Sequence, residues 1–340
     1  MATFSADLSR RGPGLLLRDI LRGENAQVDA VVGVIAEVHP DILLLTDFDH
    51  DLGNAALSAL AERLDAAGLR YPYLFSLRSN AGLASGLDLD GNGRTGEPRD
   101  AQGYGRFAGD GAMALLSRWP IDEEDVQDFS SLLWKDLPGA RLPRANGRPF
   151  PSEPAQNVQR LSSTGHWDVP VELPDGTRLH LLAFAATPPV FDGPEDRNGL
   201  RNADEIALWQ RYLDGALGVA PPADFLILGN ANLDPDDGGG LPDAIRGLLA
   251  DPRLQDPLPR SSGGAAAATV GQTGDPALDT ADWPEPDDDG PGNLRVDYVL
   301  PARSLMVRGS GVHWPEGPAG AEAAAASPHR LVWVDVEPTP

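Results

Sequence analysis

The strand-like segments of this chain are short, and they do not alternate strictly with helices. Segments typical of strands occur at residues 2–4, 41–47, 113–118, 165–172, 178–185, 224–229, 295–300 and 329–336. Apolar stripes with helical spacing occur at residues 24–39, 54–67 and 200–214. A doubly wound parallel sheet requires regular alternation of strands and helices. The pattern therefore predicts an α+β fold, with two β-sheets inside and helices outside.

A single domain of residues 1–340 is the expected organisation. The sequence has no visible internal repeat, and no linker divides it. The turn residues Pro174-Asp175-Gly176 separate two strand-like segments, 165–172 and 178–185, which predicts a β-hairpin. We expect long loops at about residues 76–110, 261–293 and 315–328, where Gly, Pro, Ala or Asp are abundant.

Charge and composition exclude several classes of protein. The net charge is −24, which disfavours tight binding to a nucleic-acid backbone. The chain has no cysteine, so disulfides, thiolate zinc sites and cysteine nucleophiles are excluded. No apolar run reaches the roughly 18 residues of a membrane span, so no membrane partner is expected. The first residues read directly as a strand, so either there is no leader or it was removed. No feature indicates an oligomeric state.

Polar residues lie at the ends of several predicted strands, where layered folds expose their active sites. They are Asp47 and Asp49 after LLLT, Asn230 and Asn232 in GNANLDP, Asp297 in RVDYVL and His329 in SPHRLVWVD. Taken singly, an Asp or Asn at a strand end is more often part of a turn or a helix cap. A lone His beside a strand is more often structural than catalytic. The order of these residues along the chain is the informative feature.

That order resembles the endonuclease/exonuclease/phosphatase superfamily, the metal-dependent phosphoesterases that include DNase I-like nucleases. The resemblance spans essentially the whole chain and also includes ATFSADL at the start and the strand LLSRWP. It implies a DNase I-like α/β/β/α sandwich. It implies that divalent Mg²⁺ or Mn²⁺ and a His hold the phosphate while an acid activates water. The implied substrate is a phosphorylated small molecule or a nucleic acid, and the net charge disfavours tight nucleic-acid binding.

Several positions depart from the pattern of that family, and they are positions that the family uses for metal binding or catalysis. The family usually has Asn in place of Ser5, and a Glu metal ligand near Asp47. It has a His near Ala185, whose methyl group can neither hold nor protonate a phosphate. Its GDxN motif reads GNAN here, and the neutral Asn230 cannot act as a base. Pro328 replaces the Asp of a closing Ser-Asp-His.

The resemblance also implies roles for the residues that remain. Asp47 would hold the metal with Ser5 nearby, and Asn232 would position the phosphate or the attacking water. Asp297 would orient His329 and raise its basicity, and His329 would contact the scissile phosphate.

The replacements at two catalytic positions, Ala185 and Asn230, imply a phosphoesterase that is weakened or inactive. Its metal site would then hold Mg²⁺ or Mn²⁺, or remain unoccupied. Three explanations stay open: a natural pseudoenzyme, an inactivated variant, or an enzyme that recruits other residues. The alternative function is a catalytically dead family member that acts as an extracellular binding or structural protein.

Other residues are candidates for contacting the substrate. They are Arg106 in GYGRFAGDG, His166 in the hairpin, and Asp192, Arg197 and Asn198 before the third helix. Each has a simpler structural interpretation. The Gly-rich stretch can serve as a turn, and His166 can be packed within the hairpin. The segment 192–205 can be a capped loop that leads into a helix.

A second candidate metal site lies in the sequence DLDGNGR, which matches the first half of a calcium loop, D-x-D-x-N-G. Its residues are Asp88, Asp90, Asn92 and Arg94, with Asp100 or Glu97 to complete the ligands. Arg99, at the twelfth position of an EF-hand loop, cannot bind a cation. The alternative is a solvated acidic loop. A structural calcium ion would favour a secreted or periplasmic protein over a cytoplasmic one.

Overall fold

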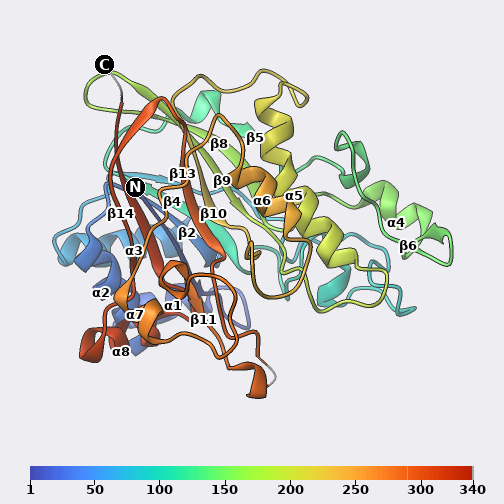
Figure 1. The fold of residues 1–340 in the computed structure, drawn as a ribbon, viewed down its shortest axis with the longest axis horizontal. Coiled ribbons are helices and arrows are strands. Elements are labelled where there is room, and N and C mark those ends of the chain that lie inside the picture. The colour runs from blue at the N-terminus through green and yellow to red at the C-terminus, as the bar shows by residue number, and fades with distance from the viewer. Residues whose placement is uncertain (289, 339–340) are drawn as a thin grey trace.

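The computed structural model describes residues 1–288 and 290–338, which form two β-sheets packed face to face between helices (Figure 1). The six-stranded sheet has the order β14-β15-β1-β2-β4-β3. Its strands are β1 (Ala2–Leu8), β2 (Ile42–Phe48), β3 (Tyr73–Phe75), β4 (Ala112–Ser117), β14 (Leu305–His313) and β15 (Leu331–Pro338). The five-stranded sheet has the order β13-β10-β9-β8-β5. Its strands are β5 (Gln127–Asp128), β8 (Gly165–Glu172), β9 (Arg178–Ala185), β10 (Phe225–Asn230) and β13 (Asp297–Pro301). This arrangement confirms the predicted α+β fold.

Helices cover the outer faces of both sheets. The helices are α1 (Leu15–Arg22), α2 (Ala26–Val38), α3 (Ala55–Ala66), α4 (Glu153–Val158), α5 (Arg197–Leu213), α6 (Asp243–Leu249), α7 (Ser262–Ala266) and α8 (Gly317–Ala326). Short strands β6 (Arg144–Ala145), β7 (Arg148–Pro149), β11 (Ala281–Asp282) and β12 (Asn293–Leu294) form two small ribbons. Single 3₁₀ turns occur at Pro98–Asp100, Glu123–Asp125, Trp134–Asp136, Pro276–Leu278 and Pro286–Asp288. No helix in the described part of the chain is long and apolar enough to cross a membrane.

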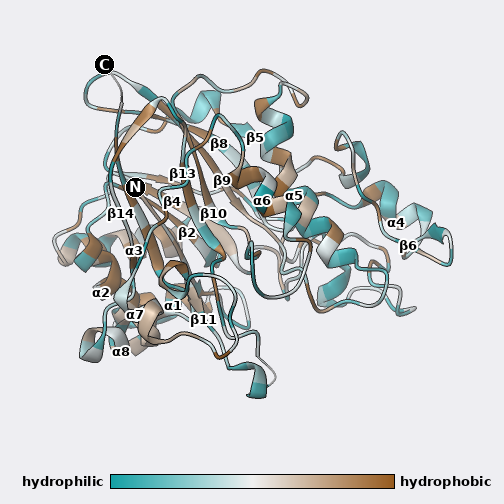
Figure 2. Cartoon of the chain, in the orientation of Figure 1, coloured by the Kyte–Doolittle hydropathy of each residue, from teal (hydrophilic) through white to brown (hydrophobic). Residues whose placement is uncertain are grey.

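Three apolar clusters hold the layers together. One lies between the six-stranded sheet and α1, α2, α3 and α8, and another lies between the five-stranded sheet and α5 and α6. The third fills the space between the two sheets, with Leu44 of β2, Leu181 of β9 and Val332 of β15 completely buried. Figure 2 shows the hydrophobic colouring concentrated on the strands, with hydrophilic residues on the outer surface of the helices. The burial of apolar area in these three layers is the main source of folding free energy.

Strand register brings polar residues from distant parts of the chain to one edge of the sandwich. β1 and β2 are parallel, with Ser5 opposite Thr46, so these two strands end together. β9 and β10 are also parallel, with Ala185 opposite Asn230. β13 runs antiparallel to β10, so that its first residue, Asp297, is also opposite Asn230. The candidate site therefore lies where these strand ends meet.

The hairpin prediction is confirmed, since β8 and β9 pair directly along their length. The prediction of a loop at 315–328 is wrong, because residues 317–326 form α8. Alanine has the highest intrinsic helix propensity, and Ala323 and Ala326 are buried in the apolar cluster shared with α2. The predicted loop at 261–293 contains α7 and the two-stranded ribbon of β11 and β12.

Candidate active site

A cavity of about 620 Å³ opens at the edge where the strand ends meet. Its lining includes seven of the residues singled out from the sequence: Ser5, Asp47, Arg106, Ala185, Asn230, Asn232 and His329. Asp297 lies directly beneath this lining and is completely buried. The structure thus brings together the residues that the sequence places at separate strand ends.

His329 and Asp297 form a buried pair at the wall of the cavity. His329 Nδ1 lies 2.7 Å from Asp297 Oδ2, and the Thr280 hydroxyl donates a second hydrogen bond, of 3.0 Å, to the same oxygen. Burial lowers the pKa of His329, but the negative charge of Asp297 outweighs this effect, so the pKa is raised. The ring of Trp283 packs edge-on against the imidazole, with 5.1 Å between centroids. Because Nδ1 is engaged, Nε2 is the nitrogen left to donate a proton or hydrogen bond to a ligand.

Asp47 is a half-buried carboxylate near the end of β2, in the left-handed region with φ of 54°. Burial raises its pKa to about 6; the Ser9 hydroxyl opposes this shift, and the charges of Asp7 and Asp110 add to it. Gly111 packs so closely that a Cβ atom there would lie 2.9 Å from Asp47 Oδ1. Asp47 therefore lies among like charges, which the charge of His329 offsets only in part, and no described residue forms an ion pair with it.

These surroundings fit a divalent cation. Mg²⁺ is commonly held by one or two carboxylates, with water and substrate phosphate completing its coordination. Asp47 and Asp110 both line the cavity, and a bound cation would offset the burial and the neighbouring negative charges that raise the pKa of Asp47. Ser5, which is 4% exposed, contributes a hydroxyl to the same wall.

Asn230 and Asn232 are engaged in a local turn at the end of β10. Asn230 Oδ1 accepts a 2.7 Å hydrogen bond from the backbone N–H of Asn232. Asn232 Nδ2 in turn donates to the carbonyl of Ala186, at 2.8 Å. Asn230 has no titratable group, and its neighbour across the strand, Ala185, presents only a methyl group. Neither residue can accept a proton from water.

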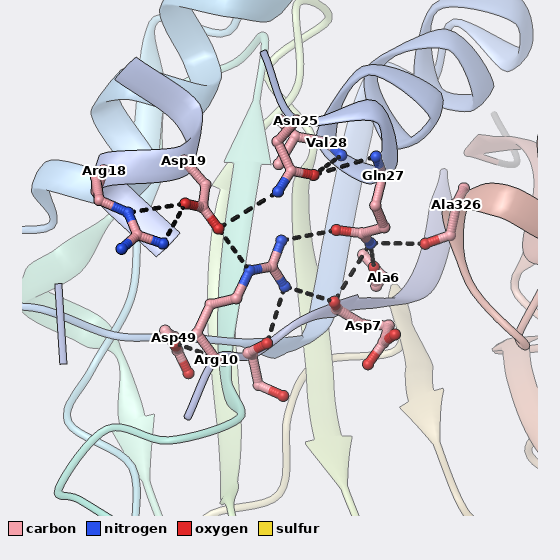
Figure 3. A network of polar contacts seen from close by, with 11 residues as sticks. Ala6, Asp7, Arg10, Arg18, Asp19, Asn25, Gln27, Val28, Asp49 and Ala326 are labelled. Atoms are coloured by element: carbon pink, nitrogen blue, oxygen red, sulfur yellow. Dashed lines mark hydrogen bonds and ion pairs between the residues drawn. The ribbon is translucent and has the colours of Figure 1, made fainter. Parts of the chain in front are cut away.

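An arginine network fixes the backbone beside this wall (Figure 3). Arg10 donates to Asp19 Oδ2 at 3.1 Å, to Gln27 Oε1 at 2.8 Å, and to the carbonyls of Asp7 and Ser9. Gln27 donates to the Ala326 carbonyl at 2.7 Å, which joins the end of α8 to the start of α2. Figure 3 shows Asp19, Gln27 and the Asp7 carbonyl around the Arg10 guanidinium, with Ala326 on the far side of Gln27. The network therefore ties the end of β1 to the segment that leads into His329.

Arg106 lies at the cavity and is partly exposed. Its guanidinium packs 5.9 Å from the centroid of the Tyr104 ring, and its backbone N–H donates to Asp110 at 2.8 Å. Its Nη1 also lies 3.9 Å from Asp110 Oδ2, a long ion pair, and the half-exposed guanidinium lines the cavity, where an anion could reach it.

His166 is placed away from the cavity lining and is completely buried. Its Nδ1 lies 2.7 Å from the Ser162 hydroxyl, and its Nε2 lies 3.0 Å from the Glu205 carbonyl. Burial lowers its pKa to about 3, so the imidazole is neutral. This geometry corrects the suggestion that His166 contacts substrate, because both ring nitrogens already have partners.

Asp192, Arg197 and Asn198 also lie outside the cavity lining. Asp192 accepts a hydrogen bond from the Asn198 backbone N–H, and Asn198 Nδ2 donates to the Val190 carbonyl at 2.7 Å. Arg197 is 9% exposed, and burial lowers its pKa while the charges of Asp90 and Asp192 oppose that shift. The hydrogen bonds of Asp192 and Asn198 hold the loop before α5, and substrate contact by the three residues stays a prediction.

The candidate calcium loop does gather its acidic residues. Asp88, Asp90 and Asp100 each offer a carboxylate oxygen within 4.8 Å of the others. Asn92 instead donates to Asp90 and to Glu97, and Arg94 pairs with Glu97 at the surface. Asp100 accepts from the backbone N–H groups of residues 89 and 97. Calcium binding here stays a prediction.

Three parts of the site were not identified from the sequence. They are Thr280 beneath Asp297, Trp283 against His329, and Phe191 at the rim of the cavity. All three come from segments without regular periodicity, so neither strand nor helix spacing could point to them. The only available signal was the presence of large aromatic residues in stretches rich in proline.

Comparisons with known proteins agree with this architecture. The family model described as the Endonuclease/Exonuclease/phosphatase family matches residues 18–329. No curated protein matches the chain. An endonuclease/exonuclease/phosphatase from Beutenbergia cavernae DSM 12333 has a TM-score of 0.56 and 15% identity, over 99% of this chain and 70% of that chain. An endonuclease/exonuclease/phosphatase family protein from Leptotrichia buccalis C-1013-b has a TM-score of 0.53 and 15% identity, over 99% of this chain and 98% of that chain. A mannosyl-6-phosphatase from Bacteroides thetaiotaomicron VPI-5482 has a TM-score of 0.50 and 12% identity, over 99% of this chain and 98% of that chain. These structures share the fold, and because the family model matches most of its length, the chain belongs to the Endonuclease/Exonuclease/phosphatase family.

Proposed function

We propose that this protein is a metal-dependent phosphoesterase whose hydrolytic step is greatly slowed by the residues at positions 185 and 230. The observation that carries the proposal is the His329–Asp297 pair, because His329 lines the same cavity as the half-buried Asp47. The charges of His329 and Asp47 interact, because the imidazolium lowers the pKa of Asp47. The carboxylates of Asp7 and Asp110 raise it. An anionic phosphate and a divalent cation would together satisfy both groups.

The roles of the residues follow from their positions. A divalent ion held by Asp47 would polarise a phosphoryl oxygen and lower the pKa of a bound water. His329 donates from Nε2 to a phosphoryl oxygen, while Asp297 fixes its tautomer through Nδ1. Asn232 is tied to the Ala186 carbonyl and limits where the phosphate can lie.

The missing groups explain why the chemistry should be slow. A positioned general base contributes roughly 10²–10⁴-fold to the rate of such a step. Asn230 cannot accept a proton, and the methyl group of Ala185 cannot replace a second imidazole beside the phosphate. Binding of phosphate and cation depends on other residues, so it should be retained.

The test is hydrolysis of bis(p-nitrophenyl) phosphate with Mg²⁺, Mn²⁺ and Ca²⁺ in turn. The Ala185→His/Asn230→Asp double variant is measured beside the unmodified chain. We expect slow metal-dependent turnover that increases by at least about 10²-fold in the double variant. His329→Ala should abolish turnover in both backgrounds, and unchanged activity in that variant would refute the assigned role.

A second candidate function is a binding protein without catalysis, and the neutral residues at positions 185 and 230 are the observation that favours it. In that case the unmodified chain would bind phosphate esters but release no product. Activity that is absent in the unmodified chain and present in the double variant would identify a phosphoesterase scaffold retained for binding. A secreted or periplasmic location remains part of this proposal.

A further inference from the structure

We propose that the cavity selects phosphate esters whose organic group is flat and aromatic. This inference rests on the proposed function, because it concerns the group attached to the bound phosphate. The ligand would lie against an aromatic wall, which we define as the side chains of Tyr104, Phe191 and Trp283 that line the cavity.

Exposure is the first argument for the aromatic wall. Phe191 is 76% exposed and Tyr104 is 58% exposed, the highest values among the aromatic side chains of the described residues. Both belong to the same cavity, although aromatic residues are only 6% of the chain. Large apolar side chains gathered at a concave surface are typical of ligand-binding sites.

Backbone strain at Phe191 is the second argument. Its φ is 68°, a conformation that is unfavourable for residues other than glycine. The segment that leads to Phe191 is fixed by two contacts: the Val190 carbonyl accepts from Asn198, and the Thr187 backbone N–H donates to the buried Glu205 at 2.7 Å. Asn202 Nδ2 also donates to the Thr187 carbonyl at 2.7 Å. Strain that is retained by several surrounding contacts is characteristic of functional positions.

The position of Trp283 links the aromatic wall to the phosphate. Its ring packs edge-on against His329, at an interplanar angle of 88°. A phosphate held by His329 would therefore have its organic group next to an aromatic surface. Aromatic rings favour such offset or edge-to-face partners over aliphatic groups of the same area.

Charge restricts the ligand further. The cavity is lined by the carboxylates Asp47, Asp110 and Asp234, and Arg106 is the one arginine among its described lining residues. The net charge of the chain is −24, so additional anionic groups on a ligand would be repelled. A singly charged phosphodiester with uncharged aromatic groups therefore fits the cavity better than a compound with several phosphates.

The experiment is isothermal titration calorimetry in Mg²⁺ with three probes: inorganic phosphate, diethyl phosphate and diphenyl phosphate. The two diesters carry the same charge and differ in the aromatic groups. We expect diphenyl phosphate to bind about tenfold more tightly than diethyl phosphate. Phe191→Ala should remove about tenfold of that affinity and leave binding of diethyl phosphate unchanged.

Leu52→Ala is the matched control, because Leu52 is 99% exposed and lies outside the cavity lining. It should leave all three affinities unchanged. Tyr104→Ala provides a second test of the aromatic wall, and thermal unfolding of each variant establishes that it is folded. Equal affinity for the two diesters, or unchanged diphenyl phosphate binding in both aromatic variants, would overturn this inference alone. Failure of all three probes to bind would overturn the proposed function and this inference with it.

Discussion

Arg10 and Arg18 share a partner, Asp19, but differ in burial, and this difference gives a strong prediction. The Arg10 side chain is 17% exposed, whereas the Arg18 side chain is 48% exposed. Arg10 makes four side-chain hydrogen bonds, to Asp19, Gln27 and two backbone carbonyls (Figure 3). Among the described residues, the Arg18 guanidinium hydrogen-bonds only to Asp19, the residue that follows it. Methionine retains much of the apolar stem at either position, so the substitution tests mainly the polar contacts.

The magnitudes follow from the two sets of contacts. A partly buried hydrogen bond contributes about 1 kcal/mol net, so Arg10→Met should lower the unfolding free energy by about 3–4 kcal/mol. An exposed ion pair contributes about 0–1 kcal/mol, so Arg18→Met should have a small effect. The assay is equilibrium unfolding in urea, which leaves ionic interactions unscreened. A difference below about 1 kcal/mol between the variants would refute the claim that the Arg10 network stabilises the end of β1.

Three further predictions concern the backbone, a buried acid and the cation. Gly229→Ala should lower the free energy of unfolding by more than about 3 kcal/mol, because the new Cβ would lie 1.9 Å from the Phe184 carbonyl oxygen. Gly53→Ala is the control in the same urea assay. Gly53 also has a positive φ but lies in open space, so this variant should lose only about 1 kcal/mol. Burial raises the pKa of Asp279 from 3.8 to about 7, so the folded state retains a proton that the unfolded state releases between about pH 4 and pH 7. Stability is therefore lost as pH rises through this window, by about 2 kcal/mol after allowance for solvent screening. Urea titrations at several pH values should show this loss in the unmodified chain and not in Asp279→Asn. Parallel pH profiles for the unmodified chain and the variant would contradict the prediction. Mg²⁺ should raise the thermal unfolding midpoint of the unmodified chain, and Asp47→Asn should remove that increase; an equal shift in both would place the cation elsewhere.

The sequence predicts the sheets and the assembly of strand ends for a definite physical reason. Apolar runs such as residues 42–45 are buried on both faces of the sheet, so the strand can be recognised from the sequence alone. Parallel pairing then places the residues that follow such strands at one edge, which is why Asp47 and Asn230 converge on one cavity. Because β2 and β10 belong to different sheets, the packing of the two sheets is also needed to bring these residues to the same cavity.

The parts that could not be predicted depend on packing between distant segments. The alanines of α8 are helical because they pack against α2, and their Gly-Pro neighbours in the sequence suggested a loop. His166 occupies a position where either a ligand or a core residue was plausible, and burial beside Ser162 decides the question. Trp283 and Phe191 lie in irregular segments, whose path is set by contacts with the rest of the molecule.

The central position of β1 has a consequence for how the protein acquires its site. β1 pairs with β2 on one side and with β15, from the opposite end of the chain, on the other. His329 lies two residues before β15, while Asp47 is the second-to-last residue of β2, so the two sides of the cavity are separated by most of the polypeptide. Such long-range pairing makes folding slow, because the entropy of closing a large loop must be overcome before the contacts form. Ligand binding in this cavity should therefore arise late in folding, and its appearance during refolding would report that the last strand has docked.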